Sequence, residues 1–258
     1  MPKILLNTVL LEKNRWEGGQ IPSIQVSNWI PAIKEKGFDG IELWQNHALK
    51  ATDYERAQLK HSDLPIDVFN SYIKFEEGYE NEREKIVNLV HELKCMAVKF
   101  NLGHSMEHTN MYISHVKAML NQLPDSCQLL CECHPGTIME DPETAYRVFD
   151  QIGSNRVKAI IHPFHDQVNI EKWFQHLGSS ITHAHVSLYN NKRFHRLNSE
   201  ETFVRKRIAK LHEHQFTGSY SIEFTAGVAT RVENTDQVFT NASEDHALLR
   251  HLSSELGV

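Results

Sequence analysis

One pattern recurs along the whole chain: a short apolar run rich in β-forming residues, followed by a longer amphipathic stretch. The eight apolar runs are residues 4–10, 40–43, 66–69, 96–100, 128–132, 157–161, 181–186 and 220–224. From the second run on, their centres lie 24 to 38 residues apart, which is the spacing of strand–helix–strand units. Alternation of this kind predicts parallel strands joined by helices.

The number of repeats favours a closed sheet over an open one. Eight strand–helix repeats with no reversal in the middle are typical of a (β/α)8 TIM barrel, whereas an open doubly wound sheet usually has five to seven strands. The length of 258 residues is also that of a typical single barrel, about 250 residues. Because no linker or low-complexity tract interrupts the sequence, we expect one domain over residues 1–258.

Start signals mark several of the expected helices. Helical patterns at 27–36 and 53–61 begin with Ser27 and Asp53. Serine and aspartate are favoured N-caps, so we expect these two residues to cap the helices. Asp141 and Pro142 precede a third pattern at 143–150, and proline is favoured at the first helical position.

Composition narrows the class of partner. The chain carries 27 Lys and Arg against 33 Asp and Glu, a net charge of −6, which disfavours nucleic acid and favours a small molecule. No stretch approaches the ~18 apolar residues needed to cross a bilayer; we expect no membrane partner and a soluble, cytoplasmic protein. Four sparse cysteines, Cys95, Cys127, Cys131 and Cys133, indicate reduced thiols. The oligomeric state, a homo-oligomer included, stays open.

Ionisable and polar residues collect at the ends of the apolar runs, where a barrel of this kind carries its chemistry. These residues are Glu42, Trp44, Asn101, His104, Glu132, His134, His162, His165, His183, His185 and Glu223. A carboxylate within an apolar strand is expensive to bury unless it is paired or bound to a metal. Glu42, Glu132 and Glu223 are carboxylates of this kind.

Strand alternation sorts these residues by face. Side chains two apart share a face, so Glu132 and His134 lie on one face of their strand, and Cys131 and Cys133 on the other. The Cys-Glu-Cys-His string is therefore interpreted as two buried structural cysteines beside a carboxylate rather than as a thiolate site.

Four strand-end groups, Glu132, His162, His185 and Glu223, are expected to converge in the mouth of the barrel. Two carboxylates and two imidazoles suit Zn²⁺ or Mn²⁺, with cobalt, iron and magnesium as alternatives. The competing interpretation is that each is a hydrogen-bonded barrel residue without a metal.

These residues resemble those of the xylose isomerase-like TIM barrel family, which includes sugar-phosphate isomerases, ketose 3-epimerases, inosose dehydratases and endonuclease IV-type nucleases. Residues 37–43 (GFDGIEL) are similar to its second-strand signature, and 132–137 (ECHPGT) to its fifth-strand metal motif. His162-x-x-His165, His183-x-His185 and Glu223 are similar to its sixth-, seventh- and eighth-strand motifs.

The resemblance implies metal ligands at Glu132, His162, His185 and Glu223, and a substrate-binding role for His165. His162 stands where the family usually has aspartate. An imidazole there makes the site less negative by one charge and favours zinc or manganese over magnesium.

Such a site supports isomerisation or epimerisation of a sugar or sugar phosphate through an enediolate, with Glu132 and Glu223 exchanging the carbon-bound proton. Hydroxyl-binding candidates around them are His104, His134, His165, Glu42 and Asn70. We expect Trp44 or Trp16 to cover the apolar face of a sugar ring, and Lys192 and Arg193 to hold a phosphate or carboxylate.

Three alternatives remain: an inosose dehydratase-like lyase, an endonuclease IV-like abasic-site nuclease, and a barrel that binds a sugar or metal without turnover. The nuclease type carries a further Asp-x-His pair after the seventh strand, where residues 190–196 read NNKRFHR. The sequence thus argues against the nuclease.

Overall fold

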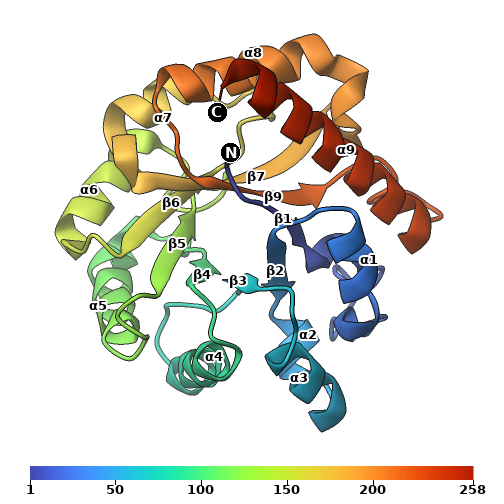
Figure 1. Cartoon of the computed structure of the whole chain (residues 1–258). Coiled ribbons are helices and arrows are strands. Elements are labelled where there is room, and N and C mark those ends of the chain that lie inside the picture. Colours follow the sequence, from blue (N-terminus) through green and yellow to red (C-terminus); the bar gives the residue numbers. More distant parts are fainter. Residues whose placement is uncertain (258) are drawn as a thin grey trace.

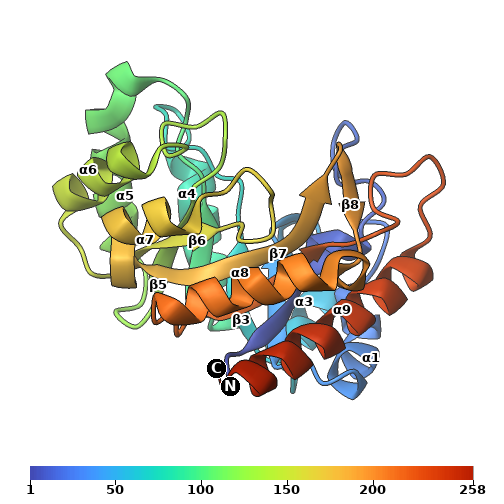
Figure 2. The ribbon, with the colours of Figure 1, turned by 90° about the horizontal axis from the view of Figure 1, so that it is seen from above.

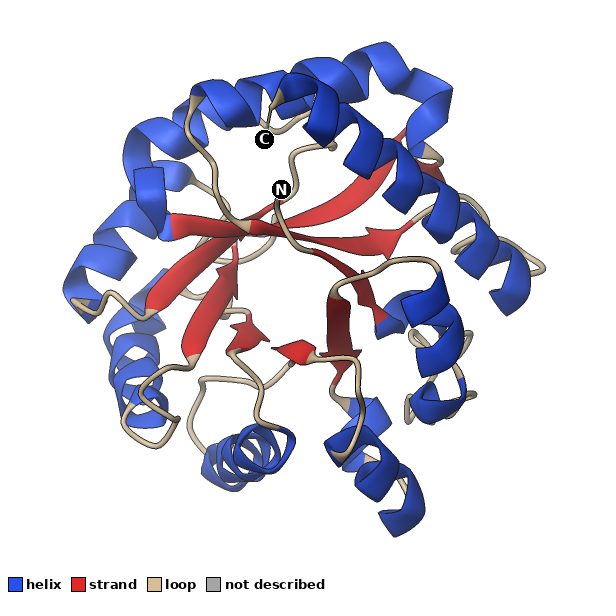
Figure 3. Cartoon of the chain, viewed as in Figure 1, coloured by secondary structure: helices blue, strands red, loops and turns tan. Residues whose placement is uncertain are grey.

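The computed structural model describes residues 1–257 and shows a closed barrel of parallel strands inside a ring of helices (Figure 1; Figure 3). The barrel strands are β1 (Ile4–Asn7), β2 (Gly40–Trp44), β3 (Ile66–Asn70), β4 (Ala97–Phe100), β5 (Gln128–Glu132), β6 (Val157–Ile161), β7 (Ile181–Asn190) and β9 (Ser219–Phe224). The α-helices are α1 (Ile30–Glu35), α2 (Asn46–Leu49), α3 (Asp53–Lys60), α4 (Glu80–Leu93), α5 (Thr109–Leu120), α6 (Pro142–Ile152), α7 (Ile170–Leu177), α8 (Glu201–Glu213) and α9 (Thr235–Leu256).

Strand pairing closes the sheet. Each barrel strand is parallel to its neighbours in chain order, and β9 pairs with both β7 and β1. Every strand therefore has a partner on each side, which an open sheet does not allow. The prediction of a (β/α)8 barrel is confirmed.

An apolar layer lines the inside of the barrel along five of its eight strands. This floor consists of Leu5, Val68, Ala97, Leu130 and Ile160, one residue from each of five strands. Two residues later on the same faces come Asn7, Asn70, Lys99, Glu132 and His162, all buried. Because side chains two apart share a face of a strand, the polar residues form a second layer directly above the floor. The strands thereby fix where polar chemistry begins.

The outer face of the sheet packs against the helices in one large apolar core. Cys131 and Cys133 belong to that core, whereas Leu130 and Glu132 face the barrel interior. All four cysteines are buried free thiols. The expectation that alternation separates the sulfurs from the carboxylate of Glu132 agrees with this arrangement.

The helix start signals were partly right. Asp141 caps α6 by accepting from the backbone N–H of Thr144 at 3.0 Å. For α3 the cap is Thr52, and Asp53 is the first helical residue. Ser27 caps no helix, because its backbone N–H donates to Glu55 at 3.0 Å and α1 begins only at Ile30.

Two strands differ in length from the sequence expectation. The first apolar run, 4–10, forms a strand only to Asn7, whose side chain then caps a short 3-10 helix, Thr8–Leu11. The seventh continues past residue 186 to Asn190 and returns as β8 (Arg193–His195), an antiparallel hairpin (Figure 2). Within residues 1–257, no helix has both the length and the apolarity to cross a bilayer.

Candidate metal centre

Glu132, His162, His185 and Glu223 meet above the apolar floor. They come from the end of β5, the residue after β6, the middle of β7 and the end of β9. None is more than 6% exposed. Each offers one ligand atom, and these four atoms lie within 4.8 Å of one another.

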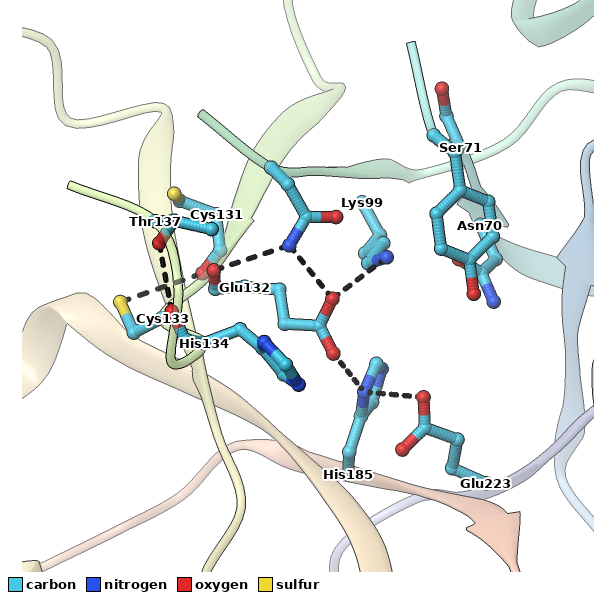
Figure 4. A network of polar contacts seen from close by, with 12 residues as sticks. Asn70, Ser71, Lys99, Cys131, Glu132, Cys133, His134, Thr137, His185 and Glu223 are labelled. Carbon is cyan, nitrogen blue, oxygen red and sulfur yellow. Dashed lines mark hydrogen bonds and ion pairs between the residues drawn. The ribbon is translucent and has the colours of Figure 1, made fainter. Parts of the chain in front are cut away.

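The two imidazoles bridge the two carboxylates. His162 Nε2 donates to Glu132 Oε1 at 3.0 Å. His185 Nδ1 lies 3.3 Å from Glu132 Oε1 and 3.3 Å from Glu223 Oε1 (Figure 4). The carboxylates therefore share a cationic or polarisable group instead of facing each other directly.

Charge, rather than burial, decides the protonation of this cluster. Burial alone raises the pKa of Glu132 and Glu223, but Lys99 and the imidazoles lower the first, and His185 the second, so both end below their ordinary values. Burial lowers the pKa of His185, yet Glu223 and Glu42 raise it well above its ordinary value. The carboxylates are thus ionised, with positive charge between them.

The donor set fits a divalent cation. Nδ1 of His162 and Nδ1 of His185 are both buried without a hydrogen-bond partner, which is costly for a polar atom unless something binds it. When His185 Nδ1 gives up its proton, these two nitrogens and the two ionised carboxylates form a donor set that suits Zn²⁺ or Mn²⁺.

A fully buried carboxylate below the cluster orients His185. Glu42 Oε1 accepts from His185 Nε2 at 3.1 Å and from Asn7 Nδ2 at 3.0 Å. Its Oε2 lies 3.2 Å from His183 Nε2. Because Nε2 of His185 is held as the donor, Nδ1 is the nitrogen turned toward the cluster. Carboxylate support of this kind is a regular companion of metal-binding histidines.

The outer oxygen of Glu132 has two donors that the sequence motifs did not assign to the site. Lys99 Nζ lies 2.8 Å from Glu132 Oε2, and Asn101 Nδ2 donates to the same oxygen at 2.9 Å. A signal was available: Lys99 is two residues beyond Ala97 and shares its face, inside the fourth apolar run. On Glu223, Ser187 Oγ donates to Oε2 at 3.0 Å.

Two of the predicted hydroxyl-binding histidines lie beside His162. The ring centroids of His165 and His134 are 4.7 Å and 6.0 Å from that of His162. Burial, and next the neighbouring His162, lower the pKa of His165 to about 3, so this ring is neutral at physiological pH. Its Nε2 is buried without a hydrogen-bond partner.

The other predicted site residues do not contact the four ligand candidates directly. Trp44 is 1% exposed and lies edge-on to His47, so its expected role in covering a sugar ring does not match its position. His104 is exposed beyond β4. Asn70 is buried and donates to Asn7 at 3.2 Å. Lys192 and Arg193 are exposed at the turn of the β7–β8 hairpin.

A row of aromatic side chains runs from the cluster toward solvent. It consists of His165, Tyr189, Phe194, Phe224 and Trp16, with successive ring centroids 5.6, 5.0, 4.8 and 6.0 Å apart. The hairpin supplies the middle of this row, and Trp16, 60% exposed, ends it. The row gives one side of the mouth an apolar wall.

Comparison with known families agrees with the fold and the motifs. A family model described as xylose isomerase-like TIM barrel matches residues 30–250. The chain belongs to this family. No curated protein matches the sequence.

Solved structures similar to this family member share its fold at low sequence identity. One is a probable 3-DHS dehydratase, AsbF, from Bacillus anthracis: 17% identity, TM-score 0.71, covering 96% of this chain and 99% of that one. Another is 3-keto-D-glucoside 4-epimerase, YcjR, from E. coli. It has 16% identity and a TM-score of 0.68, and the match covers 97% of this chain and 100% of that one. A third is a xylose isomerase-like TIM barrel protein from Mycobacterium smegmatis in complex with magnesium. It has 15% identity and a TM-score of 0.70, and the match covers 99% of this chain and 98% of that one.

Proposed function

We propose that this protein is a metal-dependent isomerase or epimerase of a sugar or sugar phosphate, which moves a proton next to a carbonyl through an enediolate. The observation that carries the proposal is the buried pair of ionised carboxylates with two unpartnered imidazole nitrogens between them. The family membership and the epimerase among the similar structures support it.

A divalent ion held by Glu132, His162, His185 and Glu223 would polarise the substrate carbonyl and acidify the neighbouring C–H. The side chains then divide the remaining work. Glu223 is the better base, because only a neutral hydroxyl, that of Ser187, donates to its Oε2. Glu132 Oε2 already faces an ammonium and an amide. We assign proton removal to Glu223. Return of that proton by Glu223 to the neighbouring carbon gives isomerisation, whereas epimerisation requires Glu132 first to take up a proton from solvent and then to deliver it on the other side.

Solvent exchange tests this assignment directly. The purified protein, with its metal content measured, is incubated in deuterated water with Mn²⁺ and a panel of ketoses, aldoses and their phosphate esters. We expect deuterium on the carbon next to the carbonyl of one substrate class, together with a new epimer or isomer. Loss of one water from the product would instead identify the dehydratase alternative.

The control is chelator-treated protein whose metal content is verified as zero. Full activity in that sample contradicts metal dependence. Turnover without deuterium points to a hydride shift between carbons. If metal-loaded protein neither exchanges nor transforms any member of the panel, the non-catalytic barrel becomes the better interpretation.

A further inference from the structure

Lys99 is a buried cation in the reacting layer, and neither the motifs nor the proposed roles account for it. It lies at the end of β4 and is 1% exposed. Its Nζ is 2.8 Å from Glu132 Oε2 and 3.9 Å from the centre of the Tyr72 ring. A carboxylate and an aromatic face both stabilise an ammonium, so the positive charge is built into the site.

The ammonium is nevertheless short of hydrogen-bond acceptors. Lys99 Nζ is buried, and its one ion-pair partner among residues 1–257 is Glu132 Oε2, at 2.8 Å. An ammonium has three N–H donors, and leaving them unsatisfied in the interior is costly. Donors are left for a further oxygen.

The topology places this cation opposite the proposed base. Around the ring of eight strands, β4 is separated from β9 by three strands in either direction. Lys99 and Glu223 therefore reach into the mouth from opposite walls, with Glu132 and His185 between them. A small ligand above these residues would have a carboxylate on one side and an ammonium on the other.

We propose that Lys99 contacts the ligand directly and donates to an oxygen that carries negative charge in the bound state. This inference rests on the proposed function and specifies its substrate class. The ligand is a carbonyl compound whose enediolate or carboxylate oxygen faces β4, while the carbon that loses a proton faces Glu223. As Glu223 removes the proton, charge moves toward the oxygen nearest Lys99, where a fixed cation stabilises it.

Oxalate is the probe, because it is a small planar anion with two adjacent oxygens, like an enediolate. Its affinity is measured calorimetrically in wild type, Lys99→Met and Lys99→Arg, both at saturating Mn²⁺ and in metal-free protein. Where the wild type binds oxalate, we expect Lys99→Met to weaken binding about tenfold or more, as for loss of a charge-assisted hydrogen bond. Lys99→Arg should recover part of the loss.

The matched control is Lys158→Met. Lys158 lies on the same face of β6 as Ile160, two residues before this floor residue, so it is separated from the mouth by the floor. Its removal should leave oxalate affinity unchanged. If Lys99→Met does not fold, Lys99→Gln removes the same charge with a polar side chain, and circular dichroism checks each variant.

Two results would overturn the proposal: oxalate affinity within twofold of wild type in the charge-removing variants at saturating Mn²⁺, or no oxalate binding by the wild type in either condition. The first would make Lys99 a positioning residue that acts only through Glu132, with its effect confined to Mn²⁺ affinity. Lys99-dependent oxalate binding without any carbon-bound proton exchange would uphold this inference and refute the proposed function. Exchange with unaffected oxalate binding would do the reverse.

Discussion

Glu132 and Glu223 are the same residue type, equally buried and joined to the same His185, yet their surroundings differ. On the β4–β5 side, Lys99 and Asn101 hold the outer oxygen of Glu132. On the β7–β9 side, the outer oxygen of Glu223 meets only the hydroxyl of Ser187 and, at 3.8 Å, His162 Nδ1. A nearby ammonium stabilises a carboxylate against protonation. The comparison indicates that Glu132 is suited to staying charged and Glu223 to accepting a proton.

The largest expected effect separates the two glutamates. Glu223→Gln should lower turnover by about 10²–10⁴-fold, the usual contribution of a general base, while the protein still takes up metal. Glu132→Gln should lower metal affinity more and, at saturating metal, lower turnover less. Steady-state kinetics with metal content measured in each variant tests this. Parental turnover in metal-loaded Glu223→Gln would remove Glu223 from the role of base.

Asp245 extends the comparison to a carboxyl on which the effect of burial outweighs that of the neighbouring cation, Arg196. Burial raises its pKa from 3.8 to about 6, against hydrogen bonds from Thr225 and the backbone N–H of Leu197. The folded state therefore binds this proton more tightly than the unfolded state, and its stabilising effect is lost as the pH rises from about 4 to about 6. Over that window the unfolding free energy of wild type should fall relative to Asp245→Asn, by up to roughly 3 kcal/mol.

Urea unfolding of both proteins at several pH values between 4 and 7 measures this difference. A difference that is constant with pH would show that Asp245 titrates normally. It would also weaken the argument that a neighbouring cation is what keeps Glu132 ionised.

Loss of the Glu42 charge, which orients His185, should have a smaller effect than loss of Glu223 from the site. Glu42→Gln keeps the size of the side chain but removes the charge that His185 donates to, so metal affinity should fall about 10–100-fold. The control is Glu12→Gln, which alters another buried Glu–His pair, Glu12 with His47 at 2.6 Å, outside the site. Calorimetric titration with metal measures the affinity of both variants. Equal losses of metal affinity in the two would contradict the role of Glu42.

The smallest effect is expected at the hairpin turn. Removing both cations, Lys192→Ala with Arg193→Ala, should raise KM for a phosphorylated substrate a few-fold at low salt and leave kcat and neutral sugars unaffected, because exposed charges are largely screened. KM for a sugar and its phosphate ester, measured at two salt concentrations, provides the test. An equal effect on both substrates would indicate a contribution other than charge.

Sequence periodicity predicted what depends on strand geometry alone. Because a strand alternates faces, the sequence predicts Glu132 and Cys131 on opposite faces, and the structure has Cys131 in the outer core. The same parity applied to Ala97 indicates that Lys99 points inward, but a lone lysine carries no motif. Its contact with Glu132 depends on two strands that are distant in sequence.

Side-chain contacts between segments far apart in the sequence could not be predicted from periodicity for the same reason. Trp44 follows an inward-facing Glu42, yet contacts with His47 and the loop after β1 bury it. The seventh strand continues through residues 187–190 (SLYN) because β8 supplies backbone partners for them, and no apolar run in the sequence predicts β8. The unequal environments of the two glutamates likewise arise from residues on other strands.

The apolar floor closes the barrel to ligands from the side opposite the polar layer. Leu5, Val68, Ala97, Leu130 and Ile160 line the interior below the polar layer, and small barrels of this kind are packed rather than hollow. A molecule bound above Glu132 therefore has one opening through which to arrive and to depart. Arrival of the next molecule must wait for departure of the last, so a product of the proposed reaction should inhibit competitively against its own substrate.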